Sequence, residues 1–298
     1  MKLRLTDIFY LIQGAIFAQK HMVIKDADTH RPLPYATAEC FARQWGSYSD
    51  SVGRMILPDS IWNNCSLVFS FVGYATKTVN LSPQLQEVFL TKLQHILDDI
   101  VLKPCTNFLE RKLEVRSKQT NFGFGYTSKA GGDFWATYVP NPTGKKGVIK
   151  TFSYGAKYGN TDAPVRLRFF QLDTSTGLPS VEITTEPIII VPGRSGWITE
   201  DISRYRIIVP GNGIVAAFEM FDAGSQYHYK TTVRMSDKTK RVAERYGWTI
   251  RGMHSPDIIG FGKRPGTSWF NLNPRNRTGA KMLTAAPQVG ISMRVCSE

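Results

Sequence analysis

The chain has 298 residues, of which 42% are hydrophobic and 20% charged, a globular composition that excludes a disordered protein. Its length fits two domains of ordinary size. Four cysteines are too few for a small disulfide-rich scaffold, and no run of 18 apolar residues predicts a bilayer-spanning helix. The many glycines, prolines, phenylalanines and tyrosines favour β-structure with frequent turns.

The net charge is +13, from 37 basic and 24 acidic residues, and the excess lies in the second part of the chain. Residues 19–103 carry 8 basic and 8 acidic residues, whereas residues 104–298 carry 27 and 15. Such a field attracts polyanions. The basic run at 238–245 lacks the interleaved stacking rings of single-strand binders. The sequence therefore favours a basic protein near a negatively charged envelope over specific nucleic-acid binding.

The first 18 residues predict a secretory signal peptide. Lys2 and Arg4 precede the apolar run 8–12, and Ala18 stands before the expected cleavage site at Gln19. The alternative is an N-terminal strand or amphipathic segment of the mature protein. We therefore expect export to the periplasm, the outer-membrane surface or the medium.

Residues 19–103 predict a domain of short β-strands separated by turns. The expected strands are 22–26, 32–41, 54–58, 65–74, 76–81 and 87–93. Their spacing over about 80 residues favours a small seven-stranded Greek-key sandwich.

Four groups of residues in this domain follow one another in the order of a known family. They are Val23, Asp26 and Thr29, then Pro-Leu-Pro-Tyr-Ala at 32–36, then Ser49, Asp50 and Gly53, then Phe-Ser-Phe-Val-Gly-Tyr at 69–74. This string resembles the carboxypeptidase-regulatory-like domain. The resemblance implies a transthyretin-like, seven-stranded antiparallel sandwich. Such domains occur beside some metallocarboxypeptidase catalytic domains and at the front of bacterial outer-membrane transporters and secreted proteins.

The family name raises the question of a zinc peptidase. Such a site needs two histidines and a glutamate, with the first histidine and the glutamate three residues apart. None of the five histidines is followed by glutamate at that spacing. The sequence thus predicts a non-catalytic protein without metal or cofactor. The alternatives are a hydrolase with an unrecognised carboxylate site and a non-specific polyanion binder.

Residues 104–128 predict a linker. Within it, residues 107–121 are expected as a short helix or extended connector, and 121–126 as a glycine-bearing strand or interdomain contact. Residues 129–298 predict a larger antiparallel, jelly-roll-like β-sandwich, which makes the whole chain all-β. The expected strands are 134–139, 147–156, 165–172, 187–193, 196–202, 205–209, 214–221 and 289–295.

The same region resembles, more weakly, the galactose-binding-like jelly rolls of secreted proteins. The resembling residues are 167–170, 177–179, 196–197, 201–202, 209–210 and 215–219. This resemblance concerns the fold and carries no function by itself. Long loops are expected over 222–288, where binding residues tend to lie.

Aromatic and polar residues of this region predict a glycan site. Tryptophan and tyrosine rings stack on sugar faces, and polar side chains bind the hydroxyl groups. The candidates are Trp197, Trp248, Trp269, Tyr227, Tyr229, Arg168 and Asp222, with Asp201 and Glu219 as further hydrogen-bonding groups. The expected partner is a glycan or a protein of the cell envelope. In the alternative interpretation, the tryptophans cap the sandwich core.

The cysteines leave two possibilities open. Cys40 and Cys65 both fall on predicted strands of the first domain, and Cys105 and Cys296 lie at the two ends of the second region. Export would permit a disulfide in each pair. Otherwise the chain has four buried thiols.

Overall fold

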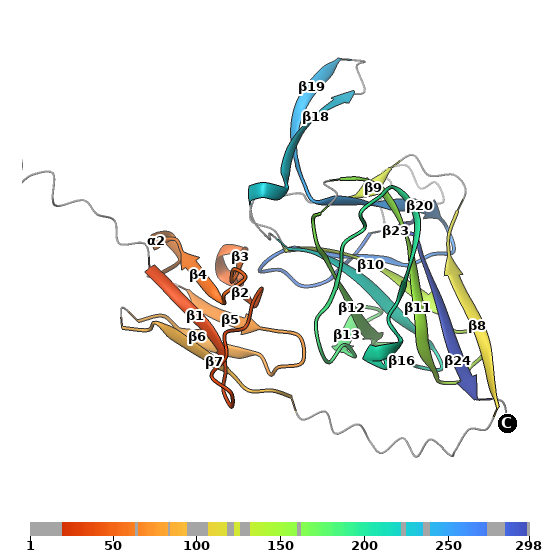
Figure 1. Ribbon diagram of the computed structural model, residues 1–298, viewed down its shortest axis with the longest axis horizontal. Coiled ribbons are helices and arrows are strands. Elements are labelled where there is room, and N and C mark those ends of the chain that lie inside the picture. Colours follow the sequence, from red (N-terminus) through yellow and green to blue (C-terminus); the bar gives the residue numbers. More distant parts are fainter. Residues whose placement is uncertain are drawn as a thin grey trace, which may run out of the picture.

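The structure is a computed structural model. It describes residues 20–62, 65–82, 84–93, 107–117, 122–125, 132–159, 162–221, 225–234, 239–272 and 284–296. The expected signal peptide, residues 1–18, lies outside the described residues. The described part of the chain is built almost entirely of β-strands, in two bodies that lie side by side (Figure 1). It contains no helix long and apolar enough to cross a membrane.

The N-terminal body is a sandwich of a three-stranded sheet, β4-β1-β7, and a four-stranded sheet, β3-β2-β5-β6. The strands are β1 (Lys20–Asp26), β2 (Thr37–Cys40), β3 (Trp45–Tyr48), β4 (Arg54–Leu57), β5 (Ser66–Ser70), β6 (Lys77–Asn80) and β7 (Glu87–Leu90). Two short helical turns, η1 (Phe41–Arg43) and α2 (Asp59–Trp62), join them. The predicted seven-stranded sandwich is confirmed. The resemblance implied that all strands are antiparallel, and this was wrong for one pair, because β1 and β7 pair in parallel.

Alternation of apolar residues explains this sandwich. Met22 and Ile24 on β1 are fully buried, and they meet Leu67 and Phe69 of β5 in one core. Successive residues of a strand point to opposite faces, so every second side chain enters that core. The sequence did not predict β3, whose residues Trp-Gly-Ser-Tyr show no apolar alternation. It forms by pairing with β2.

The C-terminal body is a larger sandwich in which every recorded strand pair is antiparallel. Its seven-stranded sheet has β13 (Pro179–Glu182), β12 (Val165–Leu172), β17 (Gly213–Met220), β10 (Asp133–Pro140), β21 (Gly260–Lys263) and β22 (Phe270–Asn271) in that order, with β14 (Ile188–Ile190) on β12. Its eight-stranded sheet runs β23 (Thr284–Pro287), β20 (Trp248–Ser255), β11 (Gly147–Gly159), β24 (Val289–Cys296) and β8 (Phe108–Val115). Strands β15 (Gly196–Asp201) and β16 (Ile208–Val209) pair with β11, and β9 (Gly123–Phe124) pairs with β20.

The core of this body lies between the two sheets. Phe152 and Tyr154 of β11 pack there against Phe218 of β17, with ring centroids 5.8 and 5.7 Å apart. Short helical turns, η2 (Ser203–Tyr205) and η3 (Ser225–Tyr227), lie outside the sheets. The predicted jelly-roll-like β-sandwich is confirmed in its class.

Three expectations about connecting segments can be compared with the structure, and the first and third need correction. Residues 108–115, expected within a linker, form β8 and pair along their full length with β24. The expected glycine-bearing strand near 121–126 is present as β9. The region 222–288, expected to hold long loops, contains strands β18 to β23.

Two of these strands form a β-hairpin. β18 (His228–Arg234) and β19 (Lys240–Tyr246) pair with each other and make a two-stranded sheet of their own. This hairpin stands away from the sandwich (Figure 1).

Candidate functional site

The two bodies meet over a row of charged residues on the outer face of the seven-stranded sheet. On β12, Leu167 and Phe169 point into the sandwich core. Their neighbours Arg166 and Arg168 therefore lie on the opposite face. Pairing with β17 sets Arg166 opposite Glu219. Because side chains alternate between the two faces of β12, both guanidinium groups lie at the domain contact.

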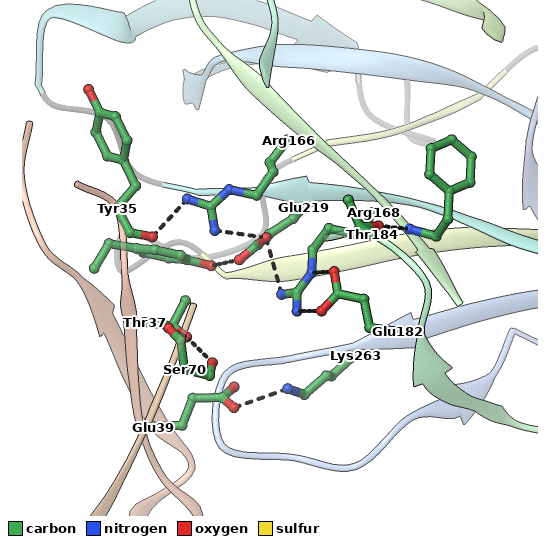
Figure 2. Close-up of polar contacts among 12 residues, drawn as sticks. Tyr35, Thr37, Glu39, Ser70, Arg166, Arg168, Glu182, Thr184, Glu219 and Lys263 are labelled. Carbon is green, nitrogen blue, oxygen red and sulfur yellow. Dashed lines mark hydrogen bonds and ion pairs between the residues drawn. The ribbon is translucent and has the colours of Figure 1, made fainter. Parts of the chain in front are cut away.

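Glu219 is the centre of this contact (Figure 2). Its side chain is fully buried and accepts hydrogen bonds from Arg166 Nη1 at 3.2 Å, from Arg168 Nη1 at 3.4 Å and from the Tyr48 hydroxyl at 3.0 Å. Arg168 also holds Glu182 through two bonds, of 2.7 and 2.5 Å. Tyr48 belongs to the N-terminal body, so the network crosses between the bodies.

The charges of this network stabilise one another. Burial favours a raised pKa for Glu219, but Arg166 and Arg168 outweigh burial and hold the pKa below its ordinary value. Burial, together with the carboxylate of Glu219, raises the pKa of Tyr48 well above its usual range. The carboxylate is therefore charged and the phenol is protonated at neutral pH, as their hydrogen bond requires.

Further contacts tie the same surfaces together. Arg166 Nη2 donates to the backbone carbonyl of Tyr35 at 2.7 Å, and Lys263 forms a 3.0 Å ion pair with Glu39. The buried ring of Phe221 packs on Tyr35 at 5.0 Å between centroids. A cavity of about 240 Å³ remains beside these groups. Each charged group named here has a partner of opposite charge, and the Lys263–Glu39 pair crosses between the two bodies.

The residues that carry the family resemblance have structural roles in the N-terminal body. Asp26 ends β1 and accepts hydrogen bonds from the backbone N–H groups of Asp28 at 2.8 Å and Thr29 at 2.7 Å. The hydroxyl of Tyr74 donates to the same carboxylate at 2.5 Å. Gly53 has a φ of 75° in the turn before β4, where a side chain would be strained.

A second feature is an open hollow on the outer face of the eight-stranded sheet. We call it the Trp197 hollow. It measures about 590 Å³ and is lined by Glu114, Arg116, Ser117, Gly196, Trp197, Arg251 and Gln288. The core residue Ile198 follows Trp197 on β15, so the indole must lie on the outer face. The sheet brings together β8, β15, β20 and the residue before β24 to line the hollow.

Two glycines make room for these side chains. Gly155 lies opposite Trp197 on the neighbouring strand, and Gly290 lies opposite Glu114. A Cβ at Gly155 would come within 2.8 Å of the Arg251 side chain, and one at Gly290 would be 3.2 Å from Glu114. The absence of side chains at these positions lets the long polar residues lie against the sheet.

The predicted glycan residues do not gather in one place. Trp197 is half-buried and lines the hollow, whereas Trp269 is half-buried on the other sheet, between Phe134 and Phe170 at 5.5 and 5.4 Å. Trp248 is 2% exposed in the sandwich core, so its ring is closed to a ligand, and its indole N–H has no hydrogen-bond partner among the described residues.

The remaining candidates are equally scattered. Tyr227 packs on Tyr246 at the base of the hairpin, and Tyr229 is on β18. Arg168 belongs to the domain contact described above, and Asp222 lies outside the described residues. The alternative that tryptophans cap the core holds for Trp248. The hollow residues Arg116, Arg251 and Gln288 carried no local signal, because three separate segments supply them.

The three cysteines in the described part of the chain are oxidised. Cys40 at the end of β2 is bonded to Cys65, which precedes β5, with 6.1 Å between their Cα atoms. Cys296 is also in a disulfide. The alternative of four buried thiols is therefore wrong. Among the described residues there is no group of three or more histidine, cysteine, aspartate or glutamate side chains placed to hold a metal ion.

Comparison with known proteins gives no family. No protein-family model matches the chain, and no curated protein matches it. Among solved structures, it is similar to the VP2 protein of infectious bursal disease virus, in a mutant that forms T=1 particles, with a TM-score of 0.26 and 7% identity over 89% of this chain. The Gx strain of the same virus gives a TM-score of 0.26 and 7% identity over 96%. The chain spans 60% and 62% of those two chains. TM-scores this low carry no argument about function.

Proposed function

We propose that this chain is an exported, non-catalytic binding protein of the bacterial cell envelope, in which a regulatory-like sandwich docks onto a basic jelly-roll-like sandwich that binds a glycan. The observation that carries the proposal is the Trp197 hollow. It is open to solvent, large enough for a sugar, and lined by an indole together with guanidinium, amide and carboxylate groups.

Two further observations support this function. Disulfides persist in oxidising compartments, and Cys40, Cys65 and Cys296 are all oxidised. The Lys263–Glu39 ion pair and the hydrogen bonds from Tyr48 to Glu219 and from Arg166 to the Tyr35 carbonyl join the two bodies, so they suit the docking of the first sandwich onto the second. This gives the regulatory-like body a structural role.

Glycan binding by the purified full chain tests the proposal. An array of envelope and plant-type glycans identifies a ligand, and calorimetry then compares the wild type with Trp197→Ala. We expect Trp197→Ala to abolish binding and Trp269→Ala, the other half-buried tryptophan of this body, to retain it. Melting temperatures of both variants show that they are folded.

Two results contradict the proposal. One is an array on which the folded protein binds no glycan. The other is binding to DNA that weakens steeply with salt and is unaffected by Trp197→Ala, which would favour a polyanion binder driven by net charge.

A further inference from the structure

We infer that the Trp197 hollow selects acidic sugars, and that Arg116 and Arg251 hold the sugar carboxylate between them. This inference rests on the proposed function and adds the chemical class of the ligand. It depends on three properties of the two arginines: their orientation, their lack of carboxylate partners and their position in one hollow.

Trp197 orients the first arginine. The guanidinium carbon of Arg116 lies 4.2 Å from the centre of the indole ring. This stacking holds an exposed, long side chain in one place, because a guanidinium is attracted to the face of the ring. Trp197 therefore contributes by positioning a cation as well as by its apolar surface.

The sheet orients the second arginine. The stem of Arg251 lies over Gly155, where an added Cβ would come within 2.8 Å of it. Its Nε donates to the backbone carbonyl of Ala156 at 3.3 Å. One of its five N–H groups is used in that bond, and the terminal nitrogens remain for a ligand. Both guanidinium groups are thus held before a ligand arrives.

The charge of the hollow favours an anion. Within the described residues, neither Arg116 nor Arg251 forms an ion pair with a carboxylate. This differs from Arg166 and Arg168, which both bind Glu219 at the domain contact. Planar guanidinium groups match the two oxygens of a carboxylate and form charge-assisted hydrogen bonds with them.

The other polar groups of the hollow suit sugar hydroxyls. Gln288 is 2% exposed, and its Nε2 donates to the carbonyl of Gly252 at 3.2 Å, which fixes its amide. Glu114, an exposed residue of β8, adds one acceptor carboxylate to the lining. A volume of about 590 Å³ is in the range of small-molecule sites and far exceeds a lone inorganic anion. A sugar that carries a carboxylate can bind the two arginines through its carboxylate and the other polar groups through its hydroxyls.

The test compares two ligands that share one skeleton and differ in whether the carboxyl groups are charged or methylated. Trigalacturonate and its methyl ester share one skeleton, and calorimetry measures the binding of each to the full chain. We expect the acid to bind at least about tenfold more tightly than the ester, as the loss of a charge-assisted hydrogen bond implies. Arg116→Gln and Arg251→Gln should each remove most of that preference, and Glu114→Gln should increase affinity for the acid by removing a like charge.

Arg111→Gln is the matched control. Arg111 is an exposed arginine on β8 that does not line the hollow, so this variant should bind the acid as the wild type does. Inorganic sulfate and phosphate are added as competitors, and displacement of trigalacturonate by either at equal concentration would overturn selection of a carboxylated sugar. Equal loss of affinity in Arg111→Gln and Arg116→Gln would overturn the inference in favour of net charge.

The failure of this inference can be told apart from the failure of the proposed function. If acid and ester bind equally and Trp197→Ala removes both, selection of the carboxylate is wrong and glycan binding stands. If no glycan of the array binds at all, both are wrong.

Discussion

At the scale of single residues, Asp26 shows how a motif acts through hydrogen bonds. Its carboxylate accepts from the Tyr74 hydroxyl and from the backbone at 28 and 29. The bond from Tyr74 contributes most to lowering the pKa of Asp26, from 3.8 to about 2. Burial, together with the carboxylate, raises the pKa of Tyr74 to about 12. The two residues lie 48 positions apart in the sequence, and their bond joins the end of β1 to the segment after β5.

We predict that Tyr74→Phe raises the pKa of Asp26 and changes the acid stability of the protein. A carboxylate with a depressed folded-state pKa stabilises the fold above its unfolded value near 4, and this stability is lost as the pH falls towards 2. Tyr74→Phe should lower the melting temperature at pH 7 and make its decline between pH 4 and 2 shallower. NMR titration of Asp26 checks the cause.

Tyr227→Phe, at the base of the hairpin, is the control and should leave the acid profile unchanged. A pKa of Asp26 that stays near 2 in Tyr74→Phe would contradict the prediction, since the backbone bonds alone would then account for it.

At the scale of strands, the sequence predicted those strands in which apolar and polar side chains alternate. Residues 165–172 were expected as a strand and form β12, where charged and apolar residues alternate from Arg166 to Phe169. β8 has no such pattern, because five of its eight residues are exposed at one end. It becomes a strand by pairing with β24, more than 170 residues later in the chain. The strand propensity of a segment contains no information about a pairing partner so far away in the sequence.

The same reason explains which site residues were found. Trp197 was predicted because its ring, like those of the other tryptophan and tyrosine candidates, could stack on the face of a sugar. Arg116 and Arg251 were missed, because their position beside Trp197 depends on the register of β8, β11 and β20. Trp248 was taken as a candidate because polar residues surround it in the sequence, whereas its strand alternation buries it.

The disulfide between the end of β2 and the start of β5 gives a prediction at this scale. It closes a loop of 25 residues, which restricts the unfolded chain and includes β3 and β4. The double variant Cys40→Ala/Cys65→Ala should lose about 3 kcal/mol of the free energy of unfolding of the full chain. Urea denaturation measures the loss. Val52→Ala, in an exposed turn of the same body, is the control, and an unchanged midpoint in the double variant would show that the crosslink adds no stability.

At the scale of the whole molecule, the question is whether the two sandwiches behave as one. Domains joined by small polar interfaces usually move relative to each other. Here the contact contains a buried ionic network around Glu219 and a buried aromatic side chain, Phe221, packed on Tyr35 and Tyr48. Separation of the bodies would break the Lys263–Glu39 ion pair and the hydrogen bonds that join Tyr48 to Glu219 and Arg166 to the Tyr35 carbonyl, so these contacts favour the docked arrangement.

We therefore predict one cooperative thermal transition for the full chain and two for Phe221→Ala. Phe221 lies 5.0 Å from the ring of Tyr35 and 4.9 Å from the guanidinium carbon of Arg166. Removing its ring leaves a cavity of the kind that costs about 3–5 kcal/mol in protein cores. Because the cavity opens at the contact, the loss falls on the coupling between bodies more than on either core. Val242→Ala, on the exposed hairpin, controls for loss of an apolar side chain and should keep one transition. Calorimetry distinguishes the outcomes: two transitions already in the wild type, or a single unshifted one in Phe221→Ala, would mean that this interface does not couple the sandwiches.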